Sequence, residues 1–475
     1  MKTPSFVRLA SFGFTFLVPA LVLAQGPLAP PPSGSLPLTD EALTPGGAPK
    51  ISMKTLTQTD PGQPIPSRDP GFTDLNGSAG VYRIKSPGHY FLTENLVGDK
   101  PIIIESDGVT LDLRGFEIRF VPSGAGAPPV AITSLVGVNT YDRITVKNGH
   151  ITGGWTEGVH LGQICSVKDL EVSGPLTYGV YVESNGLVED TQVMGPSTPP
   201  NGAGPHSGIS TGDCSVVTGC TVKKVHGIGI RVDNGSTIVD SAACENLGCG
   251  IVGMKGNTVR NSQATRNGNT GIDFYSGNTI DTCSASENVA EGFKVRSGST
   301  VQNSVSQSNQ LEGFLAQPAN VTQPNEYHTA INFLQCSATQ NKRDGFRSGI
   351  NTLFTHCTAD QNGDGQGPQQ VPGFPPAFAG PDGDGFDITE GSKLNACVAT
   401  NNARHGINGG NYNFITDTTV HANAGWGINI ASNENVVMRN YVRGNGAGAI
   451  SAAGGSVGPF ILPSASTNPN GNYSF

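Results

Sequence analysis

Charged side chains are scarce in this chain of 475 residues, where Asp, Glu, Lys and Arg together make up 14%. The charges sum to a formal net charge of -9, and Lys and Arg form no basic stripe. A protein that binds nucleic acid needs a basic surface to neutralise phosphates. We therefore expect no nucleic-acid partner. Apolar residues still make up 36% of the chain and recur regularly, which separates it from the disordered class.

Long apolar runs are also missing, with one exception at the N-terminus. There Lys2 and Arg8 precede the run "LASFGFTFLVPALVLA", and Ala24 suits cleavage before Gln25. Residues 1–24 are predicted to be a signal peptide. The alternative is a membrane anchor, which this short run, broken by Pro19, suits less well. We expect an exported protein, secreted, periplasmic or on the cell surface, whose mature chain has no membrane span.

Helical periodicity is absent as well, and so is the leucine frame of a leucine-rich repeat. Residues 25–78 are rich in Pro, Gly, Ser and Thr, which predicts a flexible linker. Beyond this linker the chain repeats a unit in which Gly precedes Ile, Val or Phe, and nine of its twelve intervals are 21 residues. The repeat glycines are Gly137, Gly158, Gly179, Gly208, Gly229, Gly250, Gly271, Gly292, Gly313, Gly345, Gly385, Gly406 and Gly427.

Three apolar columns accompany the repeat glycines, at one, nine and fourteen places after each. In the coil that begins at Gly229 they are Ile230, Ile238 and Ala243. Three short apolar segments per period, rich in β-branched residues, indicate three strands per coil. A fixed period of this length is typical of a solenoid. The sequence therefore predicts an all-β, single-stranded right-handed parallel β-helix of about 14 coils of ~21 residues over 79–463, followed by a C-terminal tail at 464–475.

Two further columns are polar or small. Seventeen places after the glycine, allowing for insertions, stand Asn246, Asn267, Asn288, Asn309, Asn341, Asn362, Asn402 and Asn423. Asn tolerates the left-handed conformation and bonds to nearby backbone, so we expect it at a tight corner, stacked in a ladder along the coils. Twelve places after the glycine stand Cys220, Cys283, Cys336, Cys357 and Cys397, which predicts a small buried column rather than disulfides. Cys244 and Cys249 are the candidates for a bond.

The coils and the phrase "ESDGVTLDLRGFEI" resemble the pectin-lyase-like right-handed β-helix proteins of the carbohydrate-binding and sugar-hydrolase type, over about residues 79–460. The order of segments is also similar to that of uncharacterised exported bacterial β-helix proteins. The resemblance implies an acidic polysaccharide bound along one outer sheet, and a lyase, hydrolase or epimerase. The motifs of the polygalacturonases and the arginine signature of the lyases are missing. The coil pattern therefore indicates the fold more strongly than the activity.

The predicted site follows the strand that begins at each repeat glycine. One place before the glycine, six successive coils carry Glu291, Glu312, Asp344, Asp384, His405 and Trp426. If exposed, carboxylates at this spacing would repel one another by about 1 kcal/mol per neighbouring pair, which a bound cation, a base or a raised pKa would relieve. The catalytic candidates are Asp344, Asp384, Asp387 and His405, with Arg347 pairing a substrate carboxylate. The side chains of Asp384 and His405 are expected to face solvent within one groove. The structural alternative is a solvated polar row on a long sheet.

Five other residues are predicted to bind substrate. They are Tyr275, Lys294, Glu312, Arg404 and Trp426, of which the two aromatic residues could stack on sugar rings.

A calcium site is predicted beside this row. The insertion at 363–384 contains "NGDGQG" and "PDGDG", so Asp364, Asp382 and Asp384 could offer oxygen ligands. Gly-Asp pairs are also ordinary turn residues, which is the alternative.

Two functions remain open at this stage. The first is an exported β-helix protein that binds, and cleaves or modifies, an acidic polysaccharide. The second is a non-enzymatic structural or adhesion protein of the cell surface or envelope. An enzyme should need its outer carboxylates, whereas a rigid spacer should tolerate their removal.

Overall fold

The structure is a computed structural model that describes residues 62–67, 74–77, 80–122, 129–196, 207–317, 330–364, 383–430, 434–452, 456–461 and 470–474. All of them belong to the compact unit Asp60–Phe475. The predicted signal peptide lies outside the described residues and stays a prediction. Among the described residues, no helix is long and apolar enough to cross a membrane.

One sheet, here called sheet B, takes one strand from each coil. It contains sixteen parallel strands, and each pairs with the strand of the next coil. Its strands are β2 (Tyr82–Ile84), β5 (Ile102–Ile104), β8 (Ile132–Thr133), β12 (Glu157–Leu161), β14 (Tyr178–Val182), β17 (Ser207–Thr211), β20 (Ile228–Val232), β23 (Ile251–Gly253), β26 (Ile272–Phe274), β29 (Phe293–Arg296), β32 (Phe314–Gln317), β35 (Phe346–Arg347), β38 (Phe386–Ile388), β41 (Ile407–Gly409), β44 (Trp426–Ile430) and β47 (Gly448–Ala452).

The second sheet, sheet A, consists of two runs of parallel strands, A1 and A2, which β11 (Thr145–Thr152) and β13 (Ser166–Ser173) join by spanning both. The other strands of A1 are β1 (Gln63–Ile65), β3 (Gly88–Leu92), β6 (Val109–Asp112), β15 (Leu187–Glu189), β18 (Val216–Thr218), β21 (Thr237–Val239), β24 (Thr258–Arg260), β27 (Thr279–Asp281), β30 (Thr300–Gln302), β33 (Asn332–Leu334), β36 (Leu353–Thr355), β39 (Lys393–Asn395), β42 (Phe414–Thr416), β45 (Val436–Met438) and β48 (Ser456–Val457). Those of A2 are β4 (Leu96–Gly98), β7 (Glu117–Phe120), β16 (Gln192–Met194), β19 (Thr221–Lys223), β22 (Ala242–Cys244), β25 (Gln263–Thr265), β28 (Ser284–Ser286), β31 (Val305–Gln307), β34 (Ser337–Thr339), β37 (Thr358–Asp360), β40 (Val398–Thr400), β43 (Thr419–His421), β46 (Tyr441–Arg443), β49 (Phe460–Ile461) and β50 (Asn472–Ser474).

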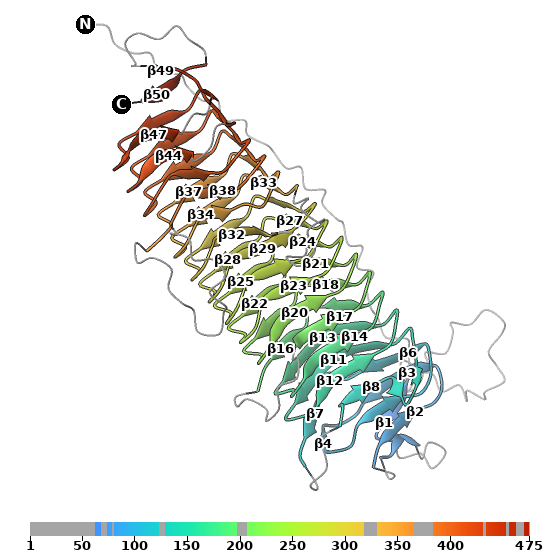
Figure 1. The fold of residues 1–475 in the computed structure, drawn as a ribbon. Helices are drawn as coiled ribbons and strands as arrows, with labels where there is room; N and C mark the ends of the chain where they lie inside the picture. The colour runs from blue at the N-terminus through green and yellow to red at the C-terminus, as the bar shows by residue number, and fades with distance from the viewer. Residues whose placement is uncertain are drawn as a thin grey trace, which may run out of the picture. The chain divides into compact units, whose positions relative to one another are not determined.

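The strands stack in chain order as a right-handed parallel solenoid of about 15 turns of ~21 residues, as Figure 1 shows by the steady change of colour along the stack. The predicted fold is confirmed. The predicted number of coils, about 14, is one fewer than the structure has. Register is kept from coil to coil: Ile230 lies beside Ile251, and Ile251 lies beside Ile272. A one-residue slip would turn every apolar column outward, so the period of the sequence fixes the register.

Phenylalanine fills the core beneath the coils where the site is predicted. Phe293, Phe314, Phe346 and Phe386 stack on successive strands of sheet B, with ring centroids 4.7, 4.7 and 4.8 Å apart. Two phenylalanines of run A1 meet this stack edge-on. Stacked and edge-on rings add to the stability that burial provides. These coils are therefore a rigid support for the side chains on their outer surface.

The asparagine ladder is confirmed, although its place in the turn differs from the prediction. Asn288 donates Nδ2–H to Asn309 Oδ1 at 2.9 Å, and Asn309 donates to Asn341 Oδ1 at 2.9 Å. The left-handed residue is the one before each ladder asparagine, for example Ser308 with φ 57°. That residue bends the chain, and the asparagine after it points inward, where its amide bonds to backbone.

Replacing Asn309 by Ala should lower the free energy of unfolding by about 1–3 kcal/mol, because it leaves buried polar groups without partners. Asn309 accepts from the backbone N–H of Asn288 and donates to Ala285 O, and its side chain is fully buried. Urea unfolding would measure the change. Gln307→Ala, at the exposed last residue of the preceding strand β31, is the matched control. Equal stabilities of the two variants would contradict a ladder that supports the fold.

Two further inner ladders run along the coils, and the sequence predicts only one of them. Ser236 donates its N–H to Asn257 Oδ1, and Asn257 donates its N–H to Asn278 Oδ1, both at 2.7 Å. The other ladder is the column of predicted small residues, and its five cysteines are buried free thiols, as expected. Cys244 and Cys249 are also free, so the bond considered between them does not form.

Both ends of the solenoid reach beyond the predicted 79–463. Strand β1 lies within the predicted linker at 25–78 and pairs with β3. Pro64 and Pro66 make this segment look unlike a strand in the sequence, but an end strand tolerates Pro, and among the described residues β1 pairs along one edge, with β3. Strand β50 lies within the predicted tail at 464–475, where Asn472 is buried and accepts from Asn440 at 3.1 Å.

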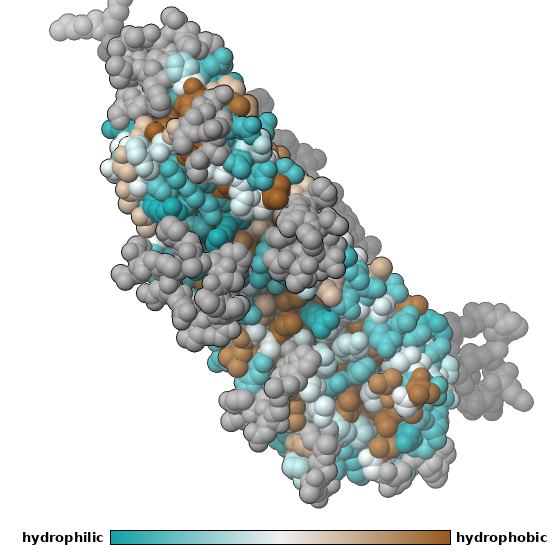
Figure 2. Space-filling model, viewed as in Figure 1, coloured by the Kyte–Doolittle hydropathy of each residue, from teal (hydrophilic) through white to brown (hydrophobic). Residues whose placement is uncertain are grey.

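The outer surface is mixed in character. Figure 2 shows a largely hydrophilic surface over the coils that carry β34, β37 and β38, with single hydrophobic residues between. Scattered apolar side chains are normal on a soluble surface. Function on this face is therefore to be sought in polar side chains.

Candidate functional site

The six residues that precede the repeat glycines, here called the corner row, lie on successive coils as predicted. Sheet B pairs Phe346 with Phe386 and Phe386 with Ile407, which brings the neighbouring Asp344, Asp384 and His405 together. The four carboxylic acids of the row are buried, however, and Asp384 has no exposed area. The expectation that Asp384 faces solvent is wrong.

Hydrogen bonds to backbone compensate for the burial of the two aspartates in the row. Asp344 Oδ1 accepts from the N–H groups of Gly383 and Asp384 at 2.9 and 2.8 Å. Asp384 Oδ1 accepts from the N–H of His405 at 2.9 Å, and its Oδ2 accepts from Arg404 Nη1 at 2.8 Å. Each side chain thus satisfies N–H groups of the next coil, as a capping residue does at a helix end.

His405 continues this pattern as a neutral imidazole. Its Nδ1 accepts from the N–H of Trp426 at 2.9 Å, which places the ring proton on Nε2. Burial and the charge of Arg404 lower the pKa of His405 to about 4. With its one lone pair engaged, the imidazole can donate a hydrogen bond but cannot serve as the predicted base.

Burial also perturbs the acids. Desolvation raises the pKa of Asp384 to about 7, against the opposing effect of Arg404. Desolvation and the charge of Asp384 raise the pKa of Asp344 well above its ordinary value. Desolvation and the charge of Glu291 raise the pKa of Glu312. The raised pKa values and the neighbouring arginines both reduce the repulsion expected along the row.

The second predicted set lies on the outer face of sheet B. Arg347 lies between two carboxylates, with Nη1 3.2 Å from Glu312 Oε1 and Nε 3.6 Å from Asp387 Oδ2. Asn408 donates to Asp387 at 3.0 Å, and Asn429 donates to Asn408 at 2.9 Å. These side chains form a continuous polar chain along successive coils. Of the five catalytic candidates, Arg347 and Asp387 are the ones that sheet B presents outward.

In most ion pairs beside this row of polar side chains, the cation is more exposed than the carboxylate. The side chain of Arg347 is 19% exposed and that of Glu312 is 4% exposed. Arg404 is 27% exposed against 1% for Asp384. The Lys294–Glu291 and Arg343–Glu312 pairs show the same order, whereas Arg347–Asp387 and Arg296–Asp273 do not. The more exposed groups in this region are therefore mainly cations. We call four of them the cationic strip: Lys294, Arg343, Arg347 and Arg404.

The predicted aromatic contacts lie at the two ends of this region. Tyr275 is 37% exposed, and the guanidinium of Arg296 lies over its ring with Cζ 4.1 Å from the centroid. Trp426 is half-buried at the start of β44. Both can offer a ring edge or face to a sugar.

The predicted calcium site stays a prediction. Asp382 lies outside the described residues, and Asp364 is exposed. Asp384 already accepts from Arg404 and His405. Within the described ranges, no group of three or more His, Cys, Asp or Glu residues could hold a metal ion.

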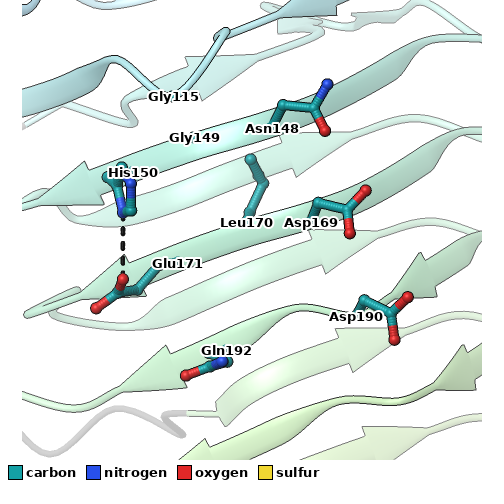
Figure 3. A pocket seen from close by; sticks show the side chains of 9 residues that line it. All are labelled: Gly115, Asn148, Gly149, His150, Asp169, Leu170, Glu171, Asp190 and Gln192. Atoms are coloured by element: carbon teal, nitrogen blue, oxygen red, sulfur yellow. Dashed lines mark hydrogen bonds and ion pairs between the residues drawn. The ribbon is translucent and has the colours of Figure 1, made fainter.

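A groove elsewhere crosses β11, β13 and β16 of sheet A (Figure 3). His150, Glu171 and Gln192 follow one side, and Asn148, Asp169 and Asp190 follow the other. His150 Nδ1 lies 3.2 Å from Glu171 Oε2. The groove carries three carboxylates against one imidazole, so it does not suit the acidic ligand that the cationic strip favours.

The sequence interpretation missed a cluster on the outer face of sheet B, further toward the N-terminus. It comprises Glu157, His160, Tyr178 and Tyr181, from β12 and β14. His160 Nδ1 lies 2.7 Å from Glu157 Oε2, and the His160 ring centroid lies 4.6 Å from that of Tyr181. These residues occupy the same repeat columns as Asp344 and Arg347, so inspecting every coil for ionisable groups would have found them.

Comparison with known proteins identifies the repeat and little more. The family model "Right handed beta helix region" matches residues 207–347. No curated protein matches the chain. The A-module of the mannuronan C-5 epimerase AlgE6 from Azotobacter vinelandii is similar in structure, with 12% identity, a TM-score of 0.41 and coverage of 77% of this chain and 90% of that one.

Two other solved structures show the same level of likeness. The periplasmic alginate epimerase AlgG matches with 13% identity and a TM-score of 0.36, covering 84% of this chain and 78% of that one. The pectate lyase Pel9A matches with 17% identity and a TM-score of 0.30, covering 70% and 74%. At these identities and TM-scores, the likeness carries no information on the activity of this chain.

Proposed function

We propose that this chain is an exported β-helix protein whose cationic strip, on sheet B and in the turns beside it, binds an acidic polysaccharide. The observation that carries the proposal is the order of exposure in the ion pairs. Four cations stand outward over carboxylates that are buried, and two of those carboxylates, Glu312 and Asp384, have raised pKa values. An anionic ligand therefore meets guanidinium and ammonium groups before it meets their partners.

A polymer suits the arrangement better than a small molecule. The outer row repeats once per coil, and adjacent strands in a sheet lie about 4.8 Å apart. Arg347, Asp387, Asn408 and Asn429 lie on four successive coils and offer donors and acceptors in line. Several weak polar contacts along one chain add to a useful affinity.

Replacing Arg347 by Ala should weaken binding of a polyuronate by about tenfold to a hundredfold, the cost of losing one charge-assisted hydrogen bond of about 1.5–3 kcal/mol. Calorimetric titration with oligogalacturonate and oligomannuronate would measure it. Arg260→Ala, which removes an exposed cation from run A1, is the matched control. Raising the salt concentration should weaken wild-type binding more than that of the variant. Equal affinities of Arg347→Ala and the control would contradict the proposal.

A rigid spacer is the second candidate, and the corner row favours it. Asp344 and Asp384 bond to the backbone of the next coil, which is a structural role. The ladders and the phenylalanine stack serve rigidity as well. A wild-type protein that binds none of the polyuronates and neutral glycans offered to it would favour the spacer.

Export is part of the proposal and rests on the N-terminal sequence alone. Expression of the full chain with detection of the mature N-terminus would test it, and we expect cleavage before Gln25.

A further inference from the structure

We propose that Glu312 competes with the acidic polysaccharide for Arg343 and Arg347, so that protonation of Glu312 strengthens binding at the cationic strip as the pH falls. This regulation rests on the proposed function, because it acts on the same site. Three features support it: the way in which Glu312 holds its two arginines, the burial of its carboxyl group and the charges around it.

One oxygen of Glu312 is shared by two guanidinium groups. Glu312 Oε1 accepts from Arg347 Nη1 at 3.2 Å and from Arg343 Nη1 at 3.5 Å. Both distances exceed the ~2.7–2.9 Å of a strong charge-assisted hydrogen bond. The side chain of Glu312 is 4% exposed, whereas those of Arg343 and Arg347 are 16% and 19% exposed. A ligand carboxylate therefore approaches the two guanidinium groups from the solvent side and competes with Glu312 for them.

Glu312 differs in this respect from the aspartates of the corner row. Asp344 Oδ1 accepts from the backbone N–H groups of Gly383 and Asp384, and Asp384 Oδ1 accepts from that of His405. Among the described residues, the side chain of Glu312 accepts from arginine side chains and from no backbone N–H of the next coil. Loss of its charge therefore changes the strip above it and leaves the pairing of the coils intact.

The surroundings of Glu312 favour its neutral form. Burial, with a contribution from the charge of Glu291, raises the pKa of Glu312 above its ordinary value of 4.5, against the effects of Arg347 and Arg343. In the described ranges, the charged groups linked to Glu312 are Glu291 and its partner Lys294, Arg343, Arg347 and its second partner Asp387, and Asp344 on the next coil. Three of them are carboxylates, and like charges nearby favour the protonated form.

Binding of an anion adds a further negative charge beside Glu312. That charge raises the pKa of Glu312 once more, so the complex keeps a proton that the free protein loses first as the pH rises. By linkage, affinity is highest where Glu312 is protonated in both states, and it falls as the pH rises through the pKa of this group. The ligand does not produce the trend, because carboxyl groups with ordinary pKa values of ~4 stay ionised above about pH 5.5.

Glu312→Gln tests the competition, because it keeps the shape of the side chain and removes its charge. Calorimetric titration with oligogalacturonate would compare it with wild type from pH 5.5 to 8.5. We expect the variant to bind about tenfold tighter at pH 8.5, the effect of removing one like charge near the ligand, and the ratio of affinities to approach one at pH 5.5. Asp384 also titrates in this range, with a pKa of about 7, but it is present in both proteins and cancels in the ratio.

Glu245→Gln is the matched control. Glu245 also lies beside cations, with Lys223, Lys224 and Arg266 at 3.5, 3.8 and 3.2 Å, but next to run A2. This variant should bind as wild type does at every pH.

A second measurement uses wild type itself. Titration in two buffers of different ionisation enthalpy measures the protons taken up on binding. We expect uptake between pH 6.5 and 8.5, and less of it in Glu312→Gln.

The failures of the two proposals are distinguishable. Binding with equal affinities of Glu312→Gln and wild type at every pH would overturn the competition and leave the binding proposal standing. Weaker binding by Glu312→Gln would also overturn it, because it would show that Glu312 positions the arginines for the ligand. If the variant does not fold, absence of proton uptake by wild type overturns the competition. Absence of binding to every polyuronate at every pH would overturn both.

Discussion

Replacing Phe346 by Ala should lower the free energy of unfolding by about 3–5 kcal/mol, the range for truncating a buried Phe. The Phe346 side chain is fully buried. Its ring lies 4.7 Å from that of Phe314 and 4.8 Å from that of Phe386, and Phe333 and Phe354 meet it edge-on at 5.8 and 5.7 Å. Truncation opens a cavity at the centre of four rings, and rigid stacked coils cannot collapse into it.

Urea unfolding would measure this loss, with two comparisons. Phe346→Leu keeps most of the volume, and its loss should be clearly smaller. Val138→Ala changes a side chain that is 99% exposed and should have no effect. A loss below about 1 kcal/mol for Phe346→Ala would contradict a core that is tightly packed at this point.

The second large effect depends on pH. The pKa of Asp384 in the fold is about 7, above its ordinary value of 3.8, so the folded state holds this proton more tightly than the unfolded state. Stability from this group is fully present below pH 3.8 and is lost as the pH rises to about 7. The free energy of unfolding of Asp384→Asn, relative to that of wild type, should therefore rise by about 4 kcal/mol between pH 4 and pH 7, at ~1.4 kcal/mol per pH unit.

The difference between Asp384→Asn and wild type cancels the contribution of His405, which acts in the opposite direction. Its pKa of about 4 lies below the ordinary 6.5, so its contribution is lost as the pH falls from about 6.5 to 4. Urea unfolding of wild type and Asp384→Asn at pH 4 to 8 gives the difference directly. Asp417→Asn, at a carboxyl whose pKa is lowered by its hydrogen bond with Arg439, should show no such gain. A difference that stays constant with pH would show that Asp384 is ionised throughout the range.

The sequence predicts the solenoid because its period is carried by many residues at once. Gly, Ile or Phe, a second apolar residue and Asn recur on coil after coil, and one register satisfies all of them. The strands at the two ends were missed because they depart from the pattern. Strand β1 contains Pro64, and Asn472 reaches its ladder only after an insertion.

The candidate site was predicted in part. The pattern correctly places Asp344, Asp384 and His405 on neighbouring coils, because register follows from the period. It does not reveal that these side chains turn toward the backbone of the next coil, since a polar residue between apolar columns suits either direction. Glu157 and His160 were missed for another reason. Their pairing depends on side-chain geometry, and two such residues three places apart are common in any sequence.

Hydrogen exchange with bound polyuronate tests the central claim most directly. The full chain would be compared with and without oligogalacturonate or oligomannuronate, and amide protection would be mapped along the strands. We predict added protection in strands β29 to β44 of sheet B and in the turns beside Arg347 and Arg404, and none in run A1. Protection confined to sheet A, or no change in any strand at saturating ligand, would contradict a polysaccharide site on the cationic strip.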